Sequence, residues 1–132
     1  MGKINIDNLF YMLECDNSLD IQDKGLKIAS EVKHLSIFLR PIENKNVWEN
    51  CAKVLTSKSN NELERYILFM FEWLQDMNWP GADIIYNRLL DFTIEEIEMC
   101  YRFSLNKARQ TDDYPWYNCL LNFWKDYSNL NQ

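Results

Sequence analysis

The stretch "WLQDMNWPG", residues 73 to 81, decides how this chain folds. Pro80 suits the first turn of a helix, because its missing N–H has no helical partner there and its ring fixes φ. The residue before a proline is pushed into an extended conformation. The stretch therefore predicts a tight corner between two helices, opened by Pro80, with Trp79 largely buried as a staple across the corner. Asp76 or Asn78 is available to bond free backbone N–H groups at this corner.

Segments on both sides of the corner have the apolar spacing of amphipathic helices. Before the corner, apolar side chains recur every three or four residues over 62–76, and Leu68 and Phe69 add a second apolar side, which predicts a central helix covered on two sides. Further upstream, the same spacing predicts a helix over 20–40, and Asn46 can cap the helix that follows it.

Capping signals mark where the later helices begin. Pro115 in "TDDYPW" repeats the arrangement at Pro80, with an acidic approach, an aromatic residue and then a proline that opens a helix. The spacing of a capping box is found in these pairs: Ser59 with Glu62, or alternatively Asn61 with Glu64, and Thr93 with Glu96.

The chain predicts an all-α fold, because no stretch alternates apolar and polar residues for long. Its three prolines are 39 and 35 residues apart, which is the length of the helical hairpins that armadillo and HEAT solenoids stack. We expect a single domain over 1–132, with six or seven helices as antiparallel pairs in a HEAT/armadillo-like right-handed stack. The expected units are a short leading helix at 5–15 and hairpins at 20–57, 61–91 and 93–130.

Composition supports a soluble domain with a substantial core. Hydrophobic residues make up 47% of the chain and aromatic residues 14%. No apolar run approaches the roughly 18–20 residues that a membrane span needs, and the first residues lack a signal-peptide core, so we expect a cytoplasmic protein without membrane contact. The four cysteines are far apart with no histidine nearby, which predicts buried thiols rather than zinc or disulfides.

Charge is unevenly distributed along the chain, whose net charge is −6. Residues 1–66 carry nine basic and ten acidic side chains, whereas residues 67–132 carry five basic and ten acidic side chains. An acidic surface repels phosphate backbones, so nucleic-acid binding is disfavoured and a basic protein partner is favoured. The simpler interpretation is that the charge maintains solubility.

No catalytic residue, metal ligand or cofactor site is predicted. His34 is the only histidine and lies on the polar side of its expected helix, so a histidine-based triad or a two-histidine metal site is excluded. No glycine-rich loop is present to hold a phosphate. The acidic run at Glu95, Glu96 and Glu98 is typical of a helix start, where negative charge is stabilised by the helix dipole.

The best candidates for a functional surface are aromatic and acidic residues at the two proline-containing corners. If the corners are equivalent, they lie at the same end of the stack and present aromatics beside carboxylates, which is common on protein-binding surfaces. Trp79 could instead pack inward. The candidate partner-binding residues are Asp76, Trp79, Asp112, Asp113, Tyr114 and Trp116.

The sequence "EWLQDMNWPGA", continuing "DIIYNRLLDF", resembles a family of small bacterial domains of unknown function. The signature of that family is a helix ending in Trp-Leu-Gln-Asp-Met/Leu-Asn-Trp-Pro, and the resemblance covers residues 60–92. It implies a small, repeat-like helical protein of a kind often suspected to be an immunity protein of bacterial contact-dependent or polymorphic toxin systems.

The leading hypothesis is therefore a non-enzymatic, cytoplasmic protein-binding module, a monomer or weak dimer whose acidic half neutralises a toxin with a basic surface. A second hypothesis is a small helical enzyme that uses Asp76 and Glu72 near a tryptophan-lined cleft. A third is a scaffold or regulatory protein that forms homodimers through exposed aromatic residues.

Overall fold

The computed structural model describes residues 5–131, which form helices and connecting loops without any strand. Three short 3₁₀ turns accompany the α-helices: η1 (Leu35–Phe38), η2 (Lys45–Val47) and η3 (Glu64–Tyr66). The α-helices are α1 (Ile6–Met12), α2 (Leu19–Ala29), α3 (Trp48–Thr56), α4 (Asn60–Leu63), α5 (Ile67–Trp73), α6 (Ala82–Leu89), α7 (Ile94–Gln110) and α8 (Tyr114–Leu130). Because η3 continues α4 directly into α5, these residues form seven helices, which agrees with the six or seven that the sequence predicts.

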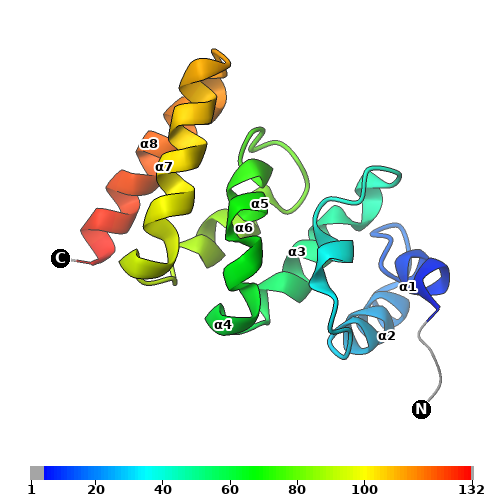
Figure 1. Ribbon diagram of the computed structural model, residues 1–132. Helices are drawn as coiled ribbons and strands as arrows, with labels where there is room; N and C mark the ends of the chain where they lie inside the picture. Colours follow the sequence, from blue (N-terminus) through cyan, green and yellow to red (C-terminus); the bar gives the residue numbers. More distant parts are fainter. Residues whose placement is uncertain (1–4, 132) are drawn as a thin grey trace.

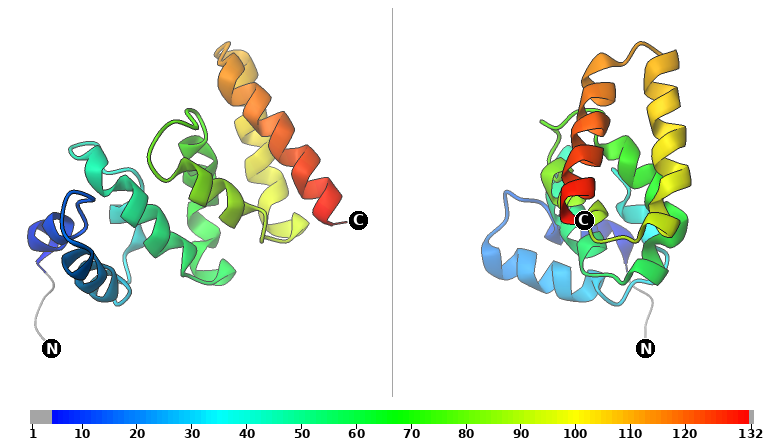
Figure 2. Two further views of the ribbon diagram at one scale, coloured as in Figure 1. Left: turned by 180° about the vertical axis from the view of Figure 1, so that it is seen from behind. Right: turned by 90° about the vertical axis from the view of Figure 1, so that its left-hand side faces the viewer.

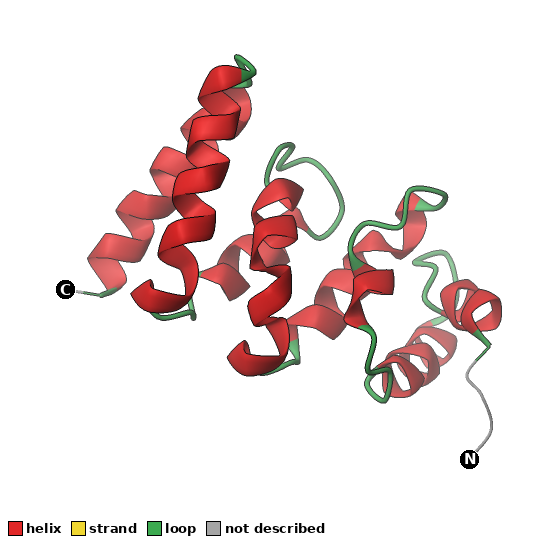
Figure 3. Ribbon diagram, viewed as in Figure 1, coloured by secondary structure: helices red, strands yellow, loops and turns green. Residues whose placement is uncertain are grey.

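The helices follow one another along the molecule in chain order (Figures 1 and 2). The N-terminal helices α1 and α2 pack together at one end, and the long hairpin of α7 and α8 forms the other end. Between them α3 packs on α6, and α5 packs on both α6 and α7. The all-α class is thus confirmed (Figure 3), whereas the likeness to a right-handed HEAT or armadillo stack and the division into three hairpin units remain predictions.

The core is rich in aromatic side chains that join helices far apart in the sequence. Phe71 of α5 and Phe123 of α8 meet edge to face with ring centroids 5.3 Å apart. The indole N–H of Trp116 donates to the backbone carbonyl of Phe71 over 3.0 Å. The hydroxyl of Tyr101 donates to the carbonyl of Leu120 over 2.8 Å. The polar atoms of these two aromatic side chains thus have hydrogen-bond acceptors, so their burial stabilises the packing and leaves neither donor unpaired.

The corner at residues 74–81 is a joint between helices, as predicted, but its helix begins later than expected. Trp73 donates its indole N–H to the carbonyl of Pro80 over 3.1 Å, which closes the loop on the end of α5. Asp76 accepts a hydrogen bond from the backbone N–H of Asn78 over 2.8 Å. The helix α6 starts at Ala82 with Gly81 as its N-cap, so the prediction that Pro80 opens the helix is wrong by two residues.

Trp79 is only partly buried, which corrects the prediction that it is largely buried. Its ring meets Trp48 edge to face, with centroids 5.6 Å apart. The guanidinium of Arg40 lies 5.2 Å from the ring centroid, and the ammonium of Lys45 lies 6.0 Å from it. The electron-rich face of an indole attracts a nearby cation, and this attraction contributes about 0.5–1 kcal/mol at an exposed site. Trp79 therefore packs on the core on one side and faces charged side chains on another.

The predicted helix over 20–40 ends at Ala29. The hydroxyl of Ser30, which follows, bonds to the carbonyl of Lys27 and competes with continuation of the helix. After a turn, η1 places Leu35 and Phe38 in the core against α3. Apolar spacing alone does not separate a long helix from a short helix followed by a 3₁₀ turn, because both bury residues at similar intervals.

The start of α3 also differs in detail from the prediction. Asn46 does not cap the helix: Asn44 caps η2 by accepting from the N–H of Asn46 over 3.0 Å, and η2 leads into α3. The capping boxes of Ser59 with Glu62 and of Thr93 with Glu96 are both formed, which confirms those predictions.

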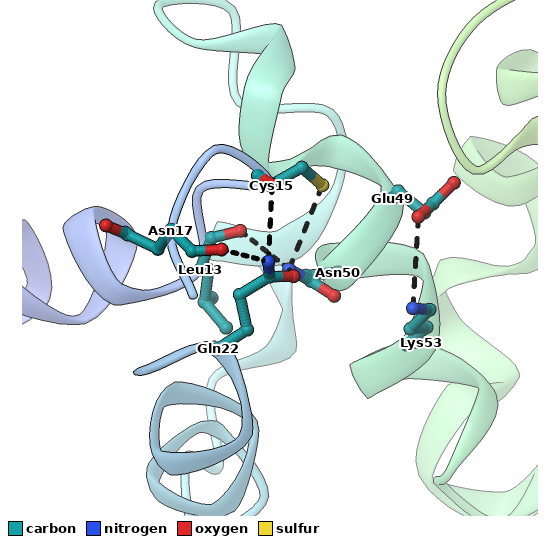
Figure 4. Close-up of polar contacts among 7 residues, drawn as sticks. All are labelled: Leu13, Cys15, Asn17, Gln22, Glu49, Asn50 and Lys53. Atoms are coloured by element: carbon teal, nitrogen blue, oxygen red, sulfur yellow. Dashed lines mark hydrogen bonds and ion pairs between the residues drawn. The ribbon is translucent and has the colours of Figure 1, made fainter. Parts of the chain in front are cut away.

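A buried amide network attaches the N-terminal helices to α3 (Figure 4). The side chain of Asn50 is fully buried, and its amide donates to the carbonyl of Leu13 over 2.7 Å and to the side-chain oxygen of Gln22 over 3.0 Å. Gln22 in turn donates to the carbonyls of Asn17 and Cys15. Because buried amides are costly when unpaired, these bonds fix the loop between α1 and α2 against α3.

Gly81 is the residue that lets the corner close. Its φ of +85° lies in the left-handed region, which side chains with a Cβ rarely adopt. A Cβ at this position would lie 2.8 Å from the Cβ of Ala52, 3.0 Å from the carbonyl oxygen of Trp48 and 3.2 Å from the ring of Trp73. The glycine thus permits both the turn and the close approach of α6 to α3.

We expect Gly81→Ala to lower the free energy of unfolding by about 2 kcal/mol or more, since it adds backbone strain to overpacking. Urea denaturation followed by circular dichroism measures the change. Gly81→Asn is the informative comparison, because asparagine tolerates a positive φ but, like alanine, adds a Cβ that would contact Ala52. The difference between the two variants therefore separates backbone strain from steric overlap. A Gly81→Ala protein as stable as the parent would contradict this role for the glycine.

Candidate functional site

A groove of 520 Å³ lies between α6 and α8 and is the best candidate for a functional site. Each of the two corners contributes one residue to it, Met77 from the corner before α6 and Pro115 from the start of α8. The groove is lined by Met77, Asp83, Tyr86, Asn87, Pro115, Asn118, Cys119, Asn122 and Asp126.

Tyr86, Asn122 and Asp126 form a hydrogen-bonded cluster in the groove. The hydroxyl of Tyr86 donates to Oδ2 of Asp126 over 2.6 Å, and the amide of Asn122 donates to the oxygen of Tyr86 over 3.0 Å. Burial raises the pKa of Tyr86, and the hydrogen bond to the Asp126 carboxylate raises it further. The phenol therefore stays protonated at neutral pH and holds the carboxylate of Asp126 in a fixed orientation.

The groove is acidic and is open to a partner. Two carboxylates, Asp83 and Asp126, line it together with three asparagine amides, and none of the lining residues is Lys, Arg or His. Met77 offers an apolar surface and is 41% exposed. This combination suits a lysine or arginine side chain, whose charged head needs acceptors and whose aliphatic stem needs an apolar contact.

The structure brings the two corners to the same edge of the molecule, as expected if they are equivalent (Figure 1). Asp76 and Asp112 are exposed there, and Asp112 has a left-handed φ of +55°. Tyr114 is 66% exposed at the start of α8. Asp113 is partly buried because it caps α8, accepting from the N–H of Trp116 over 3.2 Å.

None of the six predicted binding residues lines this groove, and the two tryptophans among them pack elsewhere. Trp116 is 1% exposed and belongs to the core, because the first turn of α8 directs it toward Phe71 of α5. Trp79 packs on Trp48, with Arg40 over its ring, and is not among the residues that line the groove. Neither tryptophan therefore contributes to the α6–α8 groove.

Sequence reasoning missed Tyr86, Asn122 and Asp126. Tyr86 has the spacing of an apolar position of its helix, and its hydrogen-bond partners lie 36 and 40 residues further along the chain. One signal was present: Asn118, Asn122 and Asp126 recur every fourth residue and form a polar line along one side of α8.

Glu72, named with Asp76 in the enzyme hypothesis, is held between two cations. Its carboxylate oxygens lie 3.2 Å from the ammonium of Lys107 and 3.9 Å from the guanidinium of Arg40. The ion pairs join α5 to α7 and to the loop before α3. In the part of the chain that the structure describes, no group of three His, Cys, Asp or Glu side chains is placed to hold a metal ion.

The four cysteines are all free, and the prediction of buried thiols is right for Cys51 and in part for Cys100 and Cys119. It is wrong for Cys15, which is exposed in the turn after α1. Cys51 is fully buried, and burial raises its pKa to about 12. Cys100 and Cys119 are partly buried, and burial raises the pKa of each. These three groups are thiols rather than reactive thiolates at neutral pH.

These features define a small all-helical domain with an acidic groove beside a tryptophan-containing corner. The chain belongs to the family described as Domain of unknown function (DUF5071), which matches residues 43–132. The matched region contains the corner and the groove and excludes α1, α2 and η1. No curated protein and no solved structure matches the chain. Within residues 5–131, no helix combines the length and apolarity needed to cross a membrane.

The raised pKa of Tyr86 predicts a loss of stability at alkaline pH. Above its ordinary pKa of about 10, the unfolded chain releases the phenolic proton while the folded protein retains it. The contribution of Tyr86 to the free energy of unfolding is therefore fully present below about pH 10. It is lost as the pH rises further, at up to about 1.4 kcal/mol per pH unit. Tyr101, whose pKa burial raises to about 12, contributes in the same direction.

We expect Tyr86→Phe to lose stability less steeply than the parent between pH 10 and 11.5, although it is less stable at pH 7. Urea midpoints at several pH values measure both effects. Tyr11→Phe is the control, because Tyr11 is exposed and does not line the groove. Parallel curves for the parent and Tyr86→Phe would contradict the assignment of the alkaline loss to Tyr86.

Proposed function

We propose that this protein is a non-enzymatic protein-binding module that receives a basic segment of its partner in the α6–α8 groove. The observation that carries the proposal is the pair of carboxylates Asp83 and Asp126 in a groove with no cationic lining residue. A lysine or arginine of the partner would pair with these carboxylates, and no cationic side chain of the groove would repel it. The excess of acidic residues over 67–132 would steer the same partner toward this half of the molecule.

Affinity in this proposal rests on apolar anchors as well as on charge. Exposed ion pairs contribute only about 0–1 kcal/mol each, so two carboxylates alone bind weakly. Met77 and the exposed Tyr114 lie at the corners beside the groove and offer surfaces for apolar contact. Tyrosine is enriched among the residues that dominate interface energies.

We further propose that the partner is a toxin and that this protein is its cytoplasmic immunity protein. Support comes from the resemblance of residues 60–92 to small bacterial domains suspected of that role, and from the acidic groove, which suits a toxin with a basic surface. An inhibitor of this kind needs no catalytic group, only a rigid surface. A stack of helices in the manner of HEAT or armadillo repeats would supply that rigidity.

We expect the protein to bind the product of a toxin-like reading frame beside its own gene. The double substitution Asp83→Asn with Asp126→Asn should weaken this binding about five- to thirtyfold. Loss of two charge pairs at about 0.5–1 kcal/mol each gives this magnitude. Isothermal titration calorimetry measures the affinity, and thermal melts verify that each variant is folded.

The matched control is Glu31→Gln with Glu43→Gln, which removes the same charge from exposed positions outside the groove. It should bind like the parent in moderate salt. Equal affinities for the groove variant and the parent would exclude the groove as the binding surface. Absence of any binding to that product would contradict the immunity role.

A further inference from the structure

The hairpin of α7 and α8 leaves one side uncovered at the end of the row of helices. α7 packs on α5, and the hairpin carries two further grooves, of 470 Å³ and 500 Å³, which are lined only by residues within 93–131. Trp124 lines both grooves and lies between them. We call this surface the end face; it comprises Ile94, Glu95, Arg102, Leu105, Leu121, Trp124 and Lys125.

The centre of the end face is apolar and well ordered by stacking. Trp124 stacks on Tyr101 with ring centroids 4.5 Å apart, and on Tyr127 with centroids 5.5 Å apart. Leu121 is 44% exposed and Ile94 is 37% exposed on either side of this stack. Aromatic groups that are already fixed lose little conformational entropy when a partner covers them.

The two grooves of the end face carry opposite charges. Arg102 and Lys125 line the first groove, which has no carboxylate among its lining residues. Glu95 lines the second groove, which has no cationic lining residue. Arg102 already pairs with Glu98 at 3.0 Å, whereas neither Glu95 nor Lys125 has an ion-pair partner among the residues described. The face thus has a basic half and an acidic half with an apolar centre.

We propose that the end face binds the end face of a second copy of this chain about a twofold axis near Trp124. A twofold interface must be complementary to itself, and this face meets that requirement because rotation places its basic half on the acidic half of the other copy. Glu95 of each copy then lies opposite Lys125 of the other, and the apolar centres cover each other. The hairpin becomes an inner layer, packed on both sides.

This interface is independent of the proposed partner-binding groove. α8 presents Asn122 and Asp126 to that groove, whereas it presents Leu121, Trp124 and Lys125 to the end face. Both surfaces can therefore be occupied at the same time. The dimer would carry two acidic grooves.

Sedimentation equilibrium over a range of protein concentrations tests the proposal. The parent should change reversibly from the 15.9 kDa monomer to a species of twice that mass as its concentration rises. Glu95→Lys and Lys125→Glu should each raise the dimer dissociation constant about tenfold, because each replaces two symmetry-related attractions by repulsions. The double variant Glu95→Lys with Lys125→Glu should restore the parent value.

Glu43→Lys is the control, since it makes the same charge change as Glu95→Lys at an exposed position that lines neither groove of the end face, and it should leave the dissociation constant unchanged. Circular dichroism verifies that every variant is folded. A parent that stays monomeric at all concentrations overturns the proposal. So does a dimer that the single charge reversals do not weaken, or one that the double reversal does not restore.

Discussion

The indole N–H of Trp73 donates a hydrogen bond to the carbonyl of Pro80, seven residues further along the chain. A fully buried indole needs an acceptor, and here the acceptor is the backbone of the loop that reverses the chain direction. This bond holds the end of α5 and the start of α6 together. Gly81, the next residue, then lies so close to Ala52 and to the backbone of Trp48 that only a glycine fits. The contact between α6 and α3 depends on that fit.

The remaining layers are attached to this joint through α5 and α3. On one side, the carbonyl of Phe71 in α5 accepts the indole N–H of Trp116, which fixes α8 beside the central helix. On the other side, Asn50 in α3 bonds the loop between α1 and α2 (Figure 4). The groove is a consequence of the same arrangement, because Met77 from the joint and Pro115 from the start of α8 are brought to one opening.

Local signals in the sequence predicted the elements whose causes are local. The capping boxes at Ser59 and Thr93 are determined by residues three apart, and both were predicted and are formed. The end of α2 at Ala29 was missed, because the C-cap at Ser30 and the 3₁₀ turn over Leu35–Phe38 do not disturb the apolar spacing. The burial of Trp116 depends on an acceptor 45 residues away and could not be read from the corner itself.

The sequence predicted that the two corners lie together but none of the residues that line the groove, for the same reason. The two corners were expected at one end of the stack, and they do lie at one edge. The hydrogen-bonded cluster of Tyr86, Asn122 and Asp126 joins two helices. Its bonded residues are 36 and 40 positions apart in the sequence, and no local pattern specifies such a pairing. The polar line along α8 was the available signal. It indicates a groove only when the side of α6 that faces it is known.

If the bond from Trp73 to Pro80 holds the joint between α5 and α6, the Trp73 indole N–H should be among the most protected groups of the protein. Hydrogen exchange of the indole N–H groups, followed by NMR, measures this protection. We expect the Trp73 indole to exchange only through global unfolding, so that its free energy of exchange equals that from urea denaturation. Exchange of the Trp73 indole as fast as that of the partly exposed Trp79 indole would show that this bond does not hold the joint.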